Sequence, residues 1–352
     1  MQKLILKNSQ SPGDILMLTA AVRDLHQSHP GCYSTDVRTS CAELWEHNPY
    51  VTRLSDEDST VRTIDCHYPL IHQSNSFPAH FLWGFIDYLN QQLGSSIRPT
   101  AFRGDIHLST EERSSPSSVA EEVGMDLPYW IIVAGGKYDY TIKWWHFRRY
   151  QEIVNHFRDR IQFVQVGEQG HYHPPLDGLI CRRGRTTLRQ LIRLVHHAAG
   201  VLCPVTSLMH LAAAVETRSD RPAPRPCVVV AGGREPPQWE SYPNHQFIHT
   251  VGSLRCCATG GCWRARTVPL EDGDEKDHPD KLCLDVVDGL PRCMAMIQPS
   301  DVIRRLEWYF ENGMARYLTR SEACRARRFN RVSQREMLLQ PGPGRQGRGR
   351  RP

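Results

Sequence analysis

The segment Gly200–Val215, GVLCPVTSLMHLAAAV, joins a short apolar run directly to a helical pattern. Val201–Cys203 predicts a buried strand, and Ser207–Val215 predicts a short helix capped by Thr206 or Ser207. The unpaired backbone amides at the start of such a helix suit an anionic group such as a diphosphate. A strand that leads straight into a helix is the repeating unit of α/β folds, so this segment indicates a layered α/β domain.

The neighbouring segments continue this alternation in both directions. Thr187–Ala199 has an amphipathic helical pattern, and Thr187 with Gln190 forms a capping box at its start. Strands are predicted at Trp130–Ala134, Ile161–Val166 and Cys227–Ala231, and helices at Trp144–Phe157 and Pro299–Leu318, the last with Ser300 as its cap. Apolar strands separated by helices predict a largely parallel sheet in this half of the chain.

The first half of the chain shows the same alternation in weaker form. Its predicted strands are Lys3–Lys7, Ser34–Arg38, Val61–Asp65 and a closing Gly104–Leu108, and its predicted helices are Asp14–Ser28 and Pro78–Leu93. The polar stretch Ser109–Asp126 then indicates an interdomain linker. We therefore expect two α/β domains, residues 1–126 with the linker and residues 127–318 with a cysteine-rich insertion at 254–295.

The composition is that of a globular protein with a basic end. Of 352 residues, 40% are hydrophobic, and no apolar stretch approaches the roughly 18 residues that span a membrane. The N-terminus has no apolar run long enough for a signal peptide, so we expect a cytoplasmic protein with reduced thiols. Residues 316–352 carry eleven arginines and two acids, whereas the remaining residues have a net charge of −4. This distribution argues against a basic core built to bind nucleic acid.

The arginines belong to an expected tail. Residues 319–352 are predicted to be disordered, most clearly in the Pro/Gly/Arg-rich end at 340–352. A solvated tail with no fixed role is expected, and contact with anionic lipid at the inner membrane face or with nucleic acid is the alternative.

Asp14 ends the turn Ser11-Pro12-Gly13-Asp14 between the first predicted strand and the first predicted helix. In an open α/β sheet this place is the carboxyl edge of the strands, where ligands bind. Asp14 is therefore a candidate catalytic residue, and the alternative is a helix-capping role, which Asp fills well.

A second candidate region is GGKYDYTIKWW, residues 135–145. A Gly-Gly turn after a strand lets the backbone approach a ligand, and Lys137, Thr141 and Lys143 would supply charge and a hydroxyl for a phosphate. The segment matches neither the P-loop of nucleoside triphosphatases nor the dinucleotide fingerprint. An exposed basic turn is the alternative.

Five of the twelve cysteines lie within 38 residues, at Cys256, Cys257, Cys262, Cys283 and Cys293. The spacing predicts a tetrahedral thiolate site made by Cys257, Cys262, Cys283 and Cys293, with Cys256 as the spare thiol. Zinc is the default ion and iron is the alternative. The intervening acidic loop is too polar to bury a core, so a structural ion would order it. Five buried or free thiols without a metal are the alternative.

These segments, taken in order, resemble glycosyltransferase family 9, the ADP-heptose:lipopolysaccharide heptosyltransferases. The family opens with a strand, a Gly-Asp turn and a helix similar to GDILMLTAAVRDLHQSHP, and it has a Lys-x-Trp element that matches Lys143-Trp144-Trp145. It also has a segment similar to GRTTLRQLIRLVHHAAGVLCPVTSLMHLAAAV. The resemblance spans about residues 1–318 and implies the α/β GT-B fold, in which two Rossmann-like domains face each other across a cleft.

The resemblance also implies a chemistry, the inverting transfer of a sugar from a nucleotide-diphosphate donor. The family's base matches Asp14, its donor-phosphate lysine matches Lys143, and its donor-binding helix start matches Thr206, Ser207 and His210. From the residues alone, a hydrogen-bonded structural role is expected for His210. Some heptosyltransferases that modify autotransporter adhesins resemble this chain further in carrying a Cys-bound iron.

One departure from the family leaves the donor open. The family usually has Asp-Thr-Gly before the donor-binding helix, whereas Val205-Thr206-Ser207 stands here. The missing carboxylate normally helps to hold the donor sugar, so a heptose of the ADP-heptose type is one donor among several.

The predicted function is a cytoplasmic heptosyltransferase-like enzyme of the cell envelope, as in lipopolysaccharide biosynthesis, whose acceptor is a glycan, a lipid or a protein. A nucleoside diphosphate is a good leaving group, so one carboxylate base suffices. Another Rossmann-like transferase with a different donor is the first alternative. The second is a metal-stapled, non-catalytic binding protein on a decayed transferase scaffold.

Overall fold

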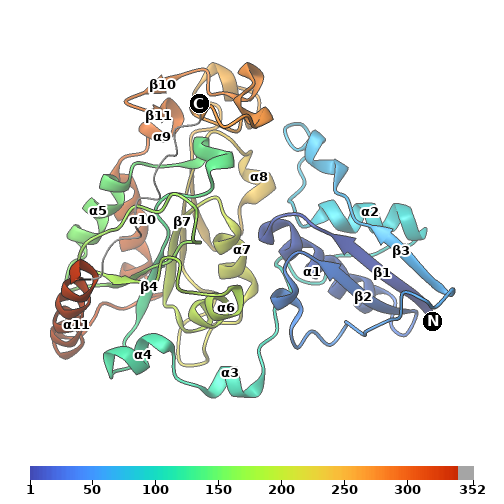
Figure 1. The fold of residues 1–352 in the computed structure, drawn as a ribbon, viewed down its shortest axis with the longest axis horizontal. Helices are drawn as coiled ribbons and strands as arrows, with labels where there is room; N and C mark the ends of the chain where they lie inside the picture. Colours follow the sequence, from blue (N-terminus) through green and yellow to red (C-terminus); the bar gives the residue numbers. More distant parts are fainter. Residues whose placement is uncertain (340–352) are drawn as a thin grey trace, which may run out of the picture.

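The computed structural model describes residues 1–339, which form two α/β domains side by side (Figure 1). The N-terminal domain has a three-stranded parallel sheet in the order β2-β1-β3. Its strands are β1 (Gln2–Asn8), β2 (Tyr33–Thr39) and β3 (Val61–Asp65). Two helices, α1 (Pro12–Ser28) and α2 (Trp83–Leu93), pack against each other beside this sheet, and α1 is buried along most of its length.

The C-terminal domain has a six-stranded, entirely parallel sheet in the order β6-β5-β4-β7-β8-β9. The strands are β4 (Tyr129–Ile132), β5 (Gln162–Gln165), β6 (Ile180–Cys181), β7 (Gly200–Pro204), β8 (Cys227–Gly232) and β9 (His245–His249). Counted from β4, this is the 3-2-1-4-5-6 order of dinucleotide-binding domains. The order reverses between β4 and β7, and ligands bind outside the carboxyl ends of the strands at such a reversal.

The helices of this domain follow the strands closely. They are α5 (Phe147–His156), α6 (Leu188–His197), α7 (Ser207–Ala214), α8 (Pro237–Glu240) and α10 (Pro299–Glu311). The predicted capping box of α6 is confirmed, because Thr187 and Gln190 each bond the backbone amide of the other. Two short strands, β6 and β9, were not predicted because too few apolar residues mark them.

Several predicted boundaries are wrong for identifiable reasons. Gly104–Leu108 is not a strand, because its backbone bonds to α1 instead of to the sheet: the Asp105 amide donates to the Thr19 hydroxyl. The helix after Pro78 begins only at Trp83, since the amide of Phe81 bonds the carbonyl of Trp239 in the other domain. The helix α5 begins at Phe147, after a separate 3-10 turn at Tyr138–Lys143.

The last predicted helix is also shorter than expected. It ends at Glu311 rather than Leu318, because the chain turns at Asn312 and Gly313, where the backbone φ is +71°. Its cap is Gln298 rather than Ser300, since Asp301 reaches back to the Gln298 amide.

The two domains pack through α1 and α7. A Cβ atom at Gly104 would lie 3.1 Å from both the Cβ atom of Ala214 in α7 and the carbonyl oxygen of Leu16 in α1, so both helices pack tightly against this glycine. Gly13 likewise faces the ring of His210. One buried apolar core runs through both domains across this contact. The N-terminal ends of α1 and α7 are thereby brought next to each other.

The segment between the domains is more ordered than a free linker. It contains α3 (Thr110–Ser114), which is exposed, and α4 (Ser118–Val123), which buries Val119 and Val123. The expected disorder of residues 319–352 is wrong for residues 320–339, which form α11 (Arg320–Leu339). Arg325 Nε on α11 donates to the Val123 carbonyl at 2.6 Å, so α11 begins docked on α4. The expected disorder of 340–352 lies outside the described residues.

The cysteine-rich insertion at 254–295 is built from short turns, a small hairpin of β10 (Val286–Val287) and β11 (Leu290–Pro291), and α9 (Arg292–Ala295). It lies over one end of the C-terminal domain (Figure 1). The buried Arg266 guanidinium holds the acidic loop by ion pairs to Asp272 at 2.8 Å and Asp277 at 2.5 Å. Among the described residues, no helix combines the length and the apolar character that crossing a bilayer requires.

Candidate active site between the two domains

Asp14 lies in the first turn of α1 and is half-buried. Its Oδ2 accepts a hydrogen bond from the Ser11 amide at 3.0 Å, and its Oδ1 accepts one from the Tyr68 hydroxyl at 2.5 Å. Ser11 is the cap residue, and Asp14 closes the capping box three positions later. The helix therefore fixes the direction of this carboxylate while leaving it partly open to solvent.

Tyr68 was not identified from the sequence. Burial, followed by the negative charge of Asp14, raises the pKa of Tyr68 far above its ordinary value. The phenol therefore stays protonated and donates to Asp14 at all ordinary pH values. The charged or ionisable side chains of Tyr140 and Glu240 also act on Tyr68, so both lie near this end of α1.

Lys143 ends the 3-10 turn after β4 and extends towards α7. Its Nζ atom lies 2.6 Å from Oε1 of Glu235 and 3.5 Å from the carbonyl oxygen of Val205. Val205 comes two residues before Ser207, the first residue of α7. The predicted lysine and the predicted helix start are thus brought together at the reversal of the sheet order.

The start of α7 is formed as expected. Thr206 is the N-cap, and its hydroxyl accepts a hydrogen bond from the Leu208 amide at 3.3 Å. Gly13 faces Ser207 across the domain contact: a Cβ atom added at Gly13 would lie 3.9 Å from the Cα atom of Ser207. Asp14, from the first domain, therefore stands close to the amides that open α7 in the second.

The side chains of two predicted donor-binding residues, Thr141 and His210, are hydrogen-bonded to other parts of the protein. Thr141 is buried, and its hydroxyl accepts the Thr267 amide at 2.8 Å, which ties the turn to the insertion. His210 is also buried, with Nδ1 at 2.7 Å from the Tyr242 hydroxyl and Nε2 at 3.3 Å from Glu240. Both side chains hold neighbouring segments, in keeping with the structural role expected for His210 from the residues alone.

Glu235 and Arg234 follow β8 at the carboxyl edge of the sheet and were also missed. The Glu235 side chain is 1% exposed, and its Oε1 atom is paired with both Lys143 and Arg234. Burial alone would raise the pKa of this carboxyl, but the two cations hold it below its ordinary value. The other carboxylate oxygen, Oε2, has no hydrogen-bond partner among the described residues.

Arg234 is held rigidly beside this carboxylate. Its guanidinium lies over the rings of Tyr140, at 4.7 Å, and Trp263, at 5.1 Å, and its Nε donates to the Arg264 carbonyl at 2.7 Å. Lys143 lies over the same Tyr140 ring at 5.5 Å. The Tyr140 ring therefore lies against both cations of the second domain.

Further contacts close the space between the domains. Lys137 Nζ lies 3.2 Å from the Ser11 hydroxyl. Asn75, in the first domain, makes a pair of hydrogen bonds with the backbone of Gly261 in the insertion, at 3.0 and 2.8 Å. A side chain at the preceding Gly260 would collide with Asn75, at 2.5 Å from its Cγ atom, so the insertion comes this close to the first domain because a glycine stands there.

A polar groove of about 1000 Å³ opens at the carboxyl ends of β1, β2 and β3. Its walls are residues 7–10, 38–40 and 65–67. The chain leaves this groove at Gln10 and enters the turn that carries Asp14. The groove is therefore an open approach to the first domain, on the side of the sheet where ligands bind in α/β proteins.

The insertion encloses a second and much smaller cavity of about 10 Å³, the space of roughly one water molecule or ion. All five clustered cysteines line it, together with Ile142 and Gly233, the neighbours of Lys143 and Arg234. Burial raises the pKa of Cys293 to about 12 and of Cys262 to about 11. No three of these sulfurs lie within 4.8 Å of one another: among the described residues, the one such group of three ligand atoms is Glu46, His47 and Glu112.

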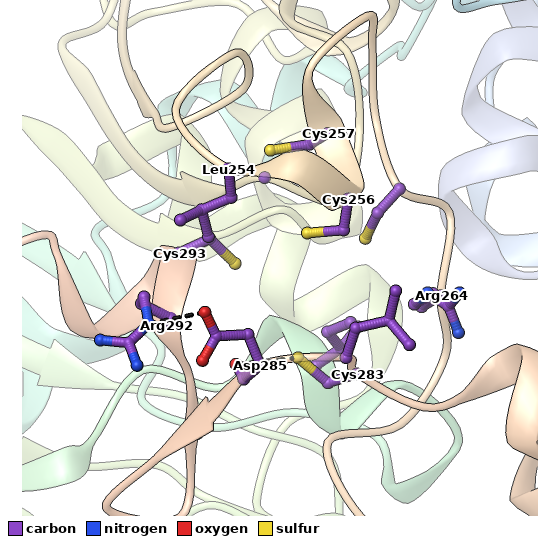
Figure 2. Close-up of a pocket in the computed structure, with 12 residues that line it drawn as sticks. Leu254, Cys256, Cys257, Arg264, Cys283, Asp285, Arg292 and Cys293 are labelled. Atoms are coloured by element: carbon purple, nitrogen blue, oxygen red, sulfur yellow. Dashed lines mark hydrogen bonds and ion pairs between the residues drawn. The ribbon is translucent and has the colours of Figure 1, made fainter.

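The two adjacent cysteines have different surroundings (Figure 2). The Cys257 thiol lies 3.6 Å from the Thr250 carbonyl, which is a natural acceptor for it. Cys256 instead faces the cavity, and its charge would act on the thiols of both Cys262 and Cys293. The geometry therefore favours Cys256 over the expected Cys257 as a partner of the other three.

With this geometry in view, the comparisons with known proteins indicate which family the chain resembles. Residues 86–219 match the profile of glycosyltransferase family 9 (heptosyltransferase). The resemblance to glycosyltransferase family 9 is confirmed. The matched residues include the Lys143 turn, the α7 start and Val205. No curated protein matches the chain.

Solved structures of family 9 enzymes share the GT-B fold of this chain. A glycosyl transferase family 9 protein from Veillonella parvula is 13% identical, with a TM-score of 0.61 over 88% of this chain and 97% of its own. The E. coli ADP-heptose lps heptosyltransferase II is 16% identical, with a TM-score of 0.53 over 90% and 100%. The iron-containing dodecameric glycosyltransferase TibC from enterotoxigenic E. coli is 18% identical, with a TM-score of 0.57 over 88% and 76%. The profile match and the shared GT-B fold thus agree on the family that this chain resembles.

Proposed function

We propose that this protein is an inverting glycosyltransferase that moves a heptose-like sugar from a nucleoside diphosphate to an acceptor hydroxyl. The observation that carries the proposal is that the start of α1, which bears Asp14, packs against the start of α7 across the domain contact. Just before α7, the carbonyl oxygen of Val205 lies 3.5 Å from Lys143 Nζ. A base and a diphosphate-binding element on opposite domains are what a displacement between two bound substrates requires.

Asp14 is proposed as the base. The acceptor oxygen attacks the anomeric carbon on the face opposite the diphosphate, and the carbon–oxygen bond to the diphosphate breaks. The nucleoside diphosphate leaves with that electron pair, and the acceptor proton passes to the Asp14 carboxylate. Tyr68, by donating to Oδ1, holds the carboxylate in one orientation during this transfer.

Lys143, Thr206 and Ser207 are proposed to hold the donor diphosphate. Charge that grows on the departing phosphate meets the Lys143 ammonium and the free amides at the start of α7. Thr141 is proposed to act indirectly, by fixing the turn that carries Lys143. The groove along β1–β3 is proposed to bind the acceptor, whether a glycan, a lipid or a protein. We place the reaction in the cytoplasm, with α11 and the following residues as a contact with the membrane face.

A structural metal ion in the cysteine cavity is also proposed. The chemistry of the donor set fits zinc or iron, because several thiols surround a space of about one ion. TibC, which shares the fold, is an iron-containing glycosyltransferase. We propose Cys256, Cys262, Cys283 and Cys293 as the ligands, with Cys257 as the spare, which exchanges the two adjacent residues relative to the sequence-based set.

Elemental analysis of protein purified without a metal-affinity tag tests the ion. We expect about one equivalent of zinc or iron, lost in Cys256→Ser and kept in Cys257→Ser, which is the matched control. Loss on Cys257→Ser alone would restore the sequence-based ligand set. Less than about a tenth of an equivalent in the wild-type protein would leave five buried thiols without a metal.

A donor screen tests the activity. The wild-type protein and Asp14→Asn are incubated with ADP-, GDP- and UDP-sugars and with glycan, lipid and peptide acceptors, and products are identified by mass spectrometry. Release of one nucleoside diphosphate with a glycosylated acceptor, lost in Asp14→Asn, is expected. Binding of a nucleotide without any turnover would favour the alternative, a non-catalytic binding protein.

A further inference from the structure

Glu235 is a buried carboxylate that shares Lys143 with Val205, the position where the family's carboxylate is missing. Val205, which stands where the family usually has Asp, is buried and apolar. The same Lys143 ammonium contacts the Val205 carbonyl at 3.5 Å and the Glu235 carboxylate at 2.6 Å. A negative charge is therefore retained beside the start of α7, but it comes from the end of β8 instead of the end of β7.

The hydrogen bonding of Glu235 is incomplete. Its two cationic partners both engage Oε1, whereas Oε2 is buried without a partner in the part of the chain that the structure describes. A buried carboxylate oxygen that lacks a donor costs free energy, which a ligand hydroxyl placed there would recover. This oxygen thus points to a group that is present only when the site is filled.

The two cations differ in how firmly they are held. Arg234 is fixed between the Tyr140 and Trp263 rings and by the Arg264 carbonyl. Lys143 is the more exposed of the two, with 23% of its side chain accessible, against 10% for Arg234. An incoming diphosphate at the α7 start can therefore draw Lys143 away from Glu235, while Arg234 keeps the carboxylate charged and oriented.

We propose that Glu235 supplies the carboxylate that this chain lacks at Val205 and accepts a hydrogen bond from a hydroxyl of the donor sugar. The inference rests on the proposed function, because it concerns the donor of that same site. It makes Glu235 a residue that distinguishes a nucleotide-sugar from the bare nucleotide. The diphosphate itself gains nothing from Glu235, since a negative charge beside it is repulsive.

Calorimetry with ADP and with ADP-D-β-D-heptose separates these contributions. The quantity compared is the ratio of the two dissociation constants, which measures what the sugar adds to binding. We expect Glu235→Gln to bind ADP as tightly as wild type or more tightly, and to lower the ratio at least about tenfold, as for a hydrogen bond to a charged group. Equal weakening of both ligands, with an unchanged ratio, would mean that Glu235 only holds Lys143 and would overturn the proposal.

A relocated carboxylate provides the matched control. The double variant Val205→Asp/Glu235→Gln returns the charge to the family's position and is expected to recover the ratio to within about threefold of wild type. Failure of this variant to raise the ratio above that of Glu235→Gln, with both proteins folded, also contradicts the proposal.

If Glu235→Gln does not fold, Glu235→Asp gives the same readout, because it keeps the charge but withdraws the oxygens by one methylene. A fall in the ratio of at least about threefold is then expected, and an unchanged ratio overturns the inference. If the donor screen shows that the wild-type protein uses a GDP- or UDP-sugar, the calorimetry compares that nucleotide-sugar with its own nucleoside diphosphate instead. No binding of any nucleotide by the wild type overturns the proposed function, whereas an unchanged ratio in an active enzyme overturns the role of Glu235 alone.

Discussion

The two sides of the domain contact are built in opposite ways. On the N-terminal side, Asp14 is half-buried, held by two hydrogen bonds, and next to a wide polar groove. On the C-terminal side, Lys143, Arg234 and Glu235 form a compact cluster of three charges, closed by aromatic rings. An open side suits an acceptor that is large or variable, and a closed side suits one small, charged donor that must be kept from water.

The largest expected effect comes from the open side. Asp14→Asn should lower turnover at least about 10²-fold with donor affinity nearly unchanged, because the base is lost while the donor site is untouched. Asn keeps an oxygen that can accept the Ser11 amide, so α1 remains capped and the melting temperature should hold. Steady-state kinetics with the donor found in the screen measures the effect, and turnover near that of wild type would remove Asp14 from the chemistry.

On the closed side, Lys143→Ala should weaken nucleoside diphosphate binding by about 1.5–3 kcal/mol, the range for a hydrogen bond to a charged group. Lys137→Ala is the control, since Lys137 contacts Ser11 across the domains and lies outside the three-charge cluster. Calorimetry with the nucleoside diphosphate gives both values. Equal losses for the two lysines would mean that bulk positive charge, rather than the Lys143 position, binds the donor.

The contact between the sides should weaken in acid. Burial lowers the pKa of His80, in the first domain, and of His245, in the second, to about 3. Tyr242 packs between the two rings, His210 lies against Tyr242, and the Arg225 guanidinium adds positive charge nearby. Both histidines are neutral when folded and take up protons on unfolding, so the stability they contribute is full above about pH 6.5 and falls as the pH drops towards 3.

For each of these histidines, the free energy of unfolding should fall by about 1 kcal/mol for every pH unit below about 6. Urea unfolding at several pH values measures the slope, and His245→Gln should reduce it. A stability that is flat between pH 7 and pH 5 would show that these rings are hydrated in solution and that the contact is looser than its packing suggests.

The smallest effect is expected at Tyr68. Tyr68→Phe removes the hydrogen bond to Asp14 and should lower turnover only about three- to tenfold, because the Ser11 amide still orients the carboxylate. Affinity for the nucleoside diphosphate should stay as in wild type, because Tyr68 belongs to the open side. A change in that affinity, with turnover intact, would reverse this assignment.

Local rules predicted the parts of this molecule that local interactions determine. The strand and helix at 200–215, the capping box of Thr187 and the turn at Asp14 all depend on residues within a few positions of one another. Helix ends that depend on the other domain were wrong, as at Pro78, where a carbonyl of Trp239 holds the backbone in an irregular path.

The candidate site shows the same limit. Lys143 and the α7 start were found because each follows a strand that is obvious in the sequence. Glu235 was missed because its partner, Lys143, is 92 positions away and is reached only through the order of β4, β7 and β8. The end of β8 at Gly232-Gly233 was a usable signal, since the next two residues stand at the ligand-binding edge of the sheet. The choice between Cys256 and Cys257 depends on one backbone turn, which spacing does not specify.

The paired hydrogen bonds between Asn75 and Gly261 have a consequence for timing. In two-domain transferases the nucleotide product escapes when the domains part, and that step often sets the turnover rate. Here the cysteine-rich insertion contacts the first domain through the side-chain amide of Asn75, which is hydrogen-bonded to the Gly261 backbone. Separation of the domains must therefore break these two hydrogen bonds. Under the proposed function, we expect their strength to influence how long the nucleotide product stays bound. Under the proposed function, an ion that orders this loop would therefore slow product release.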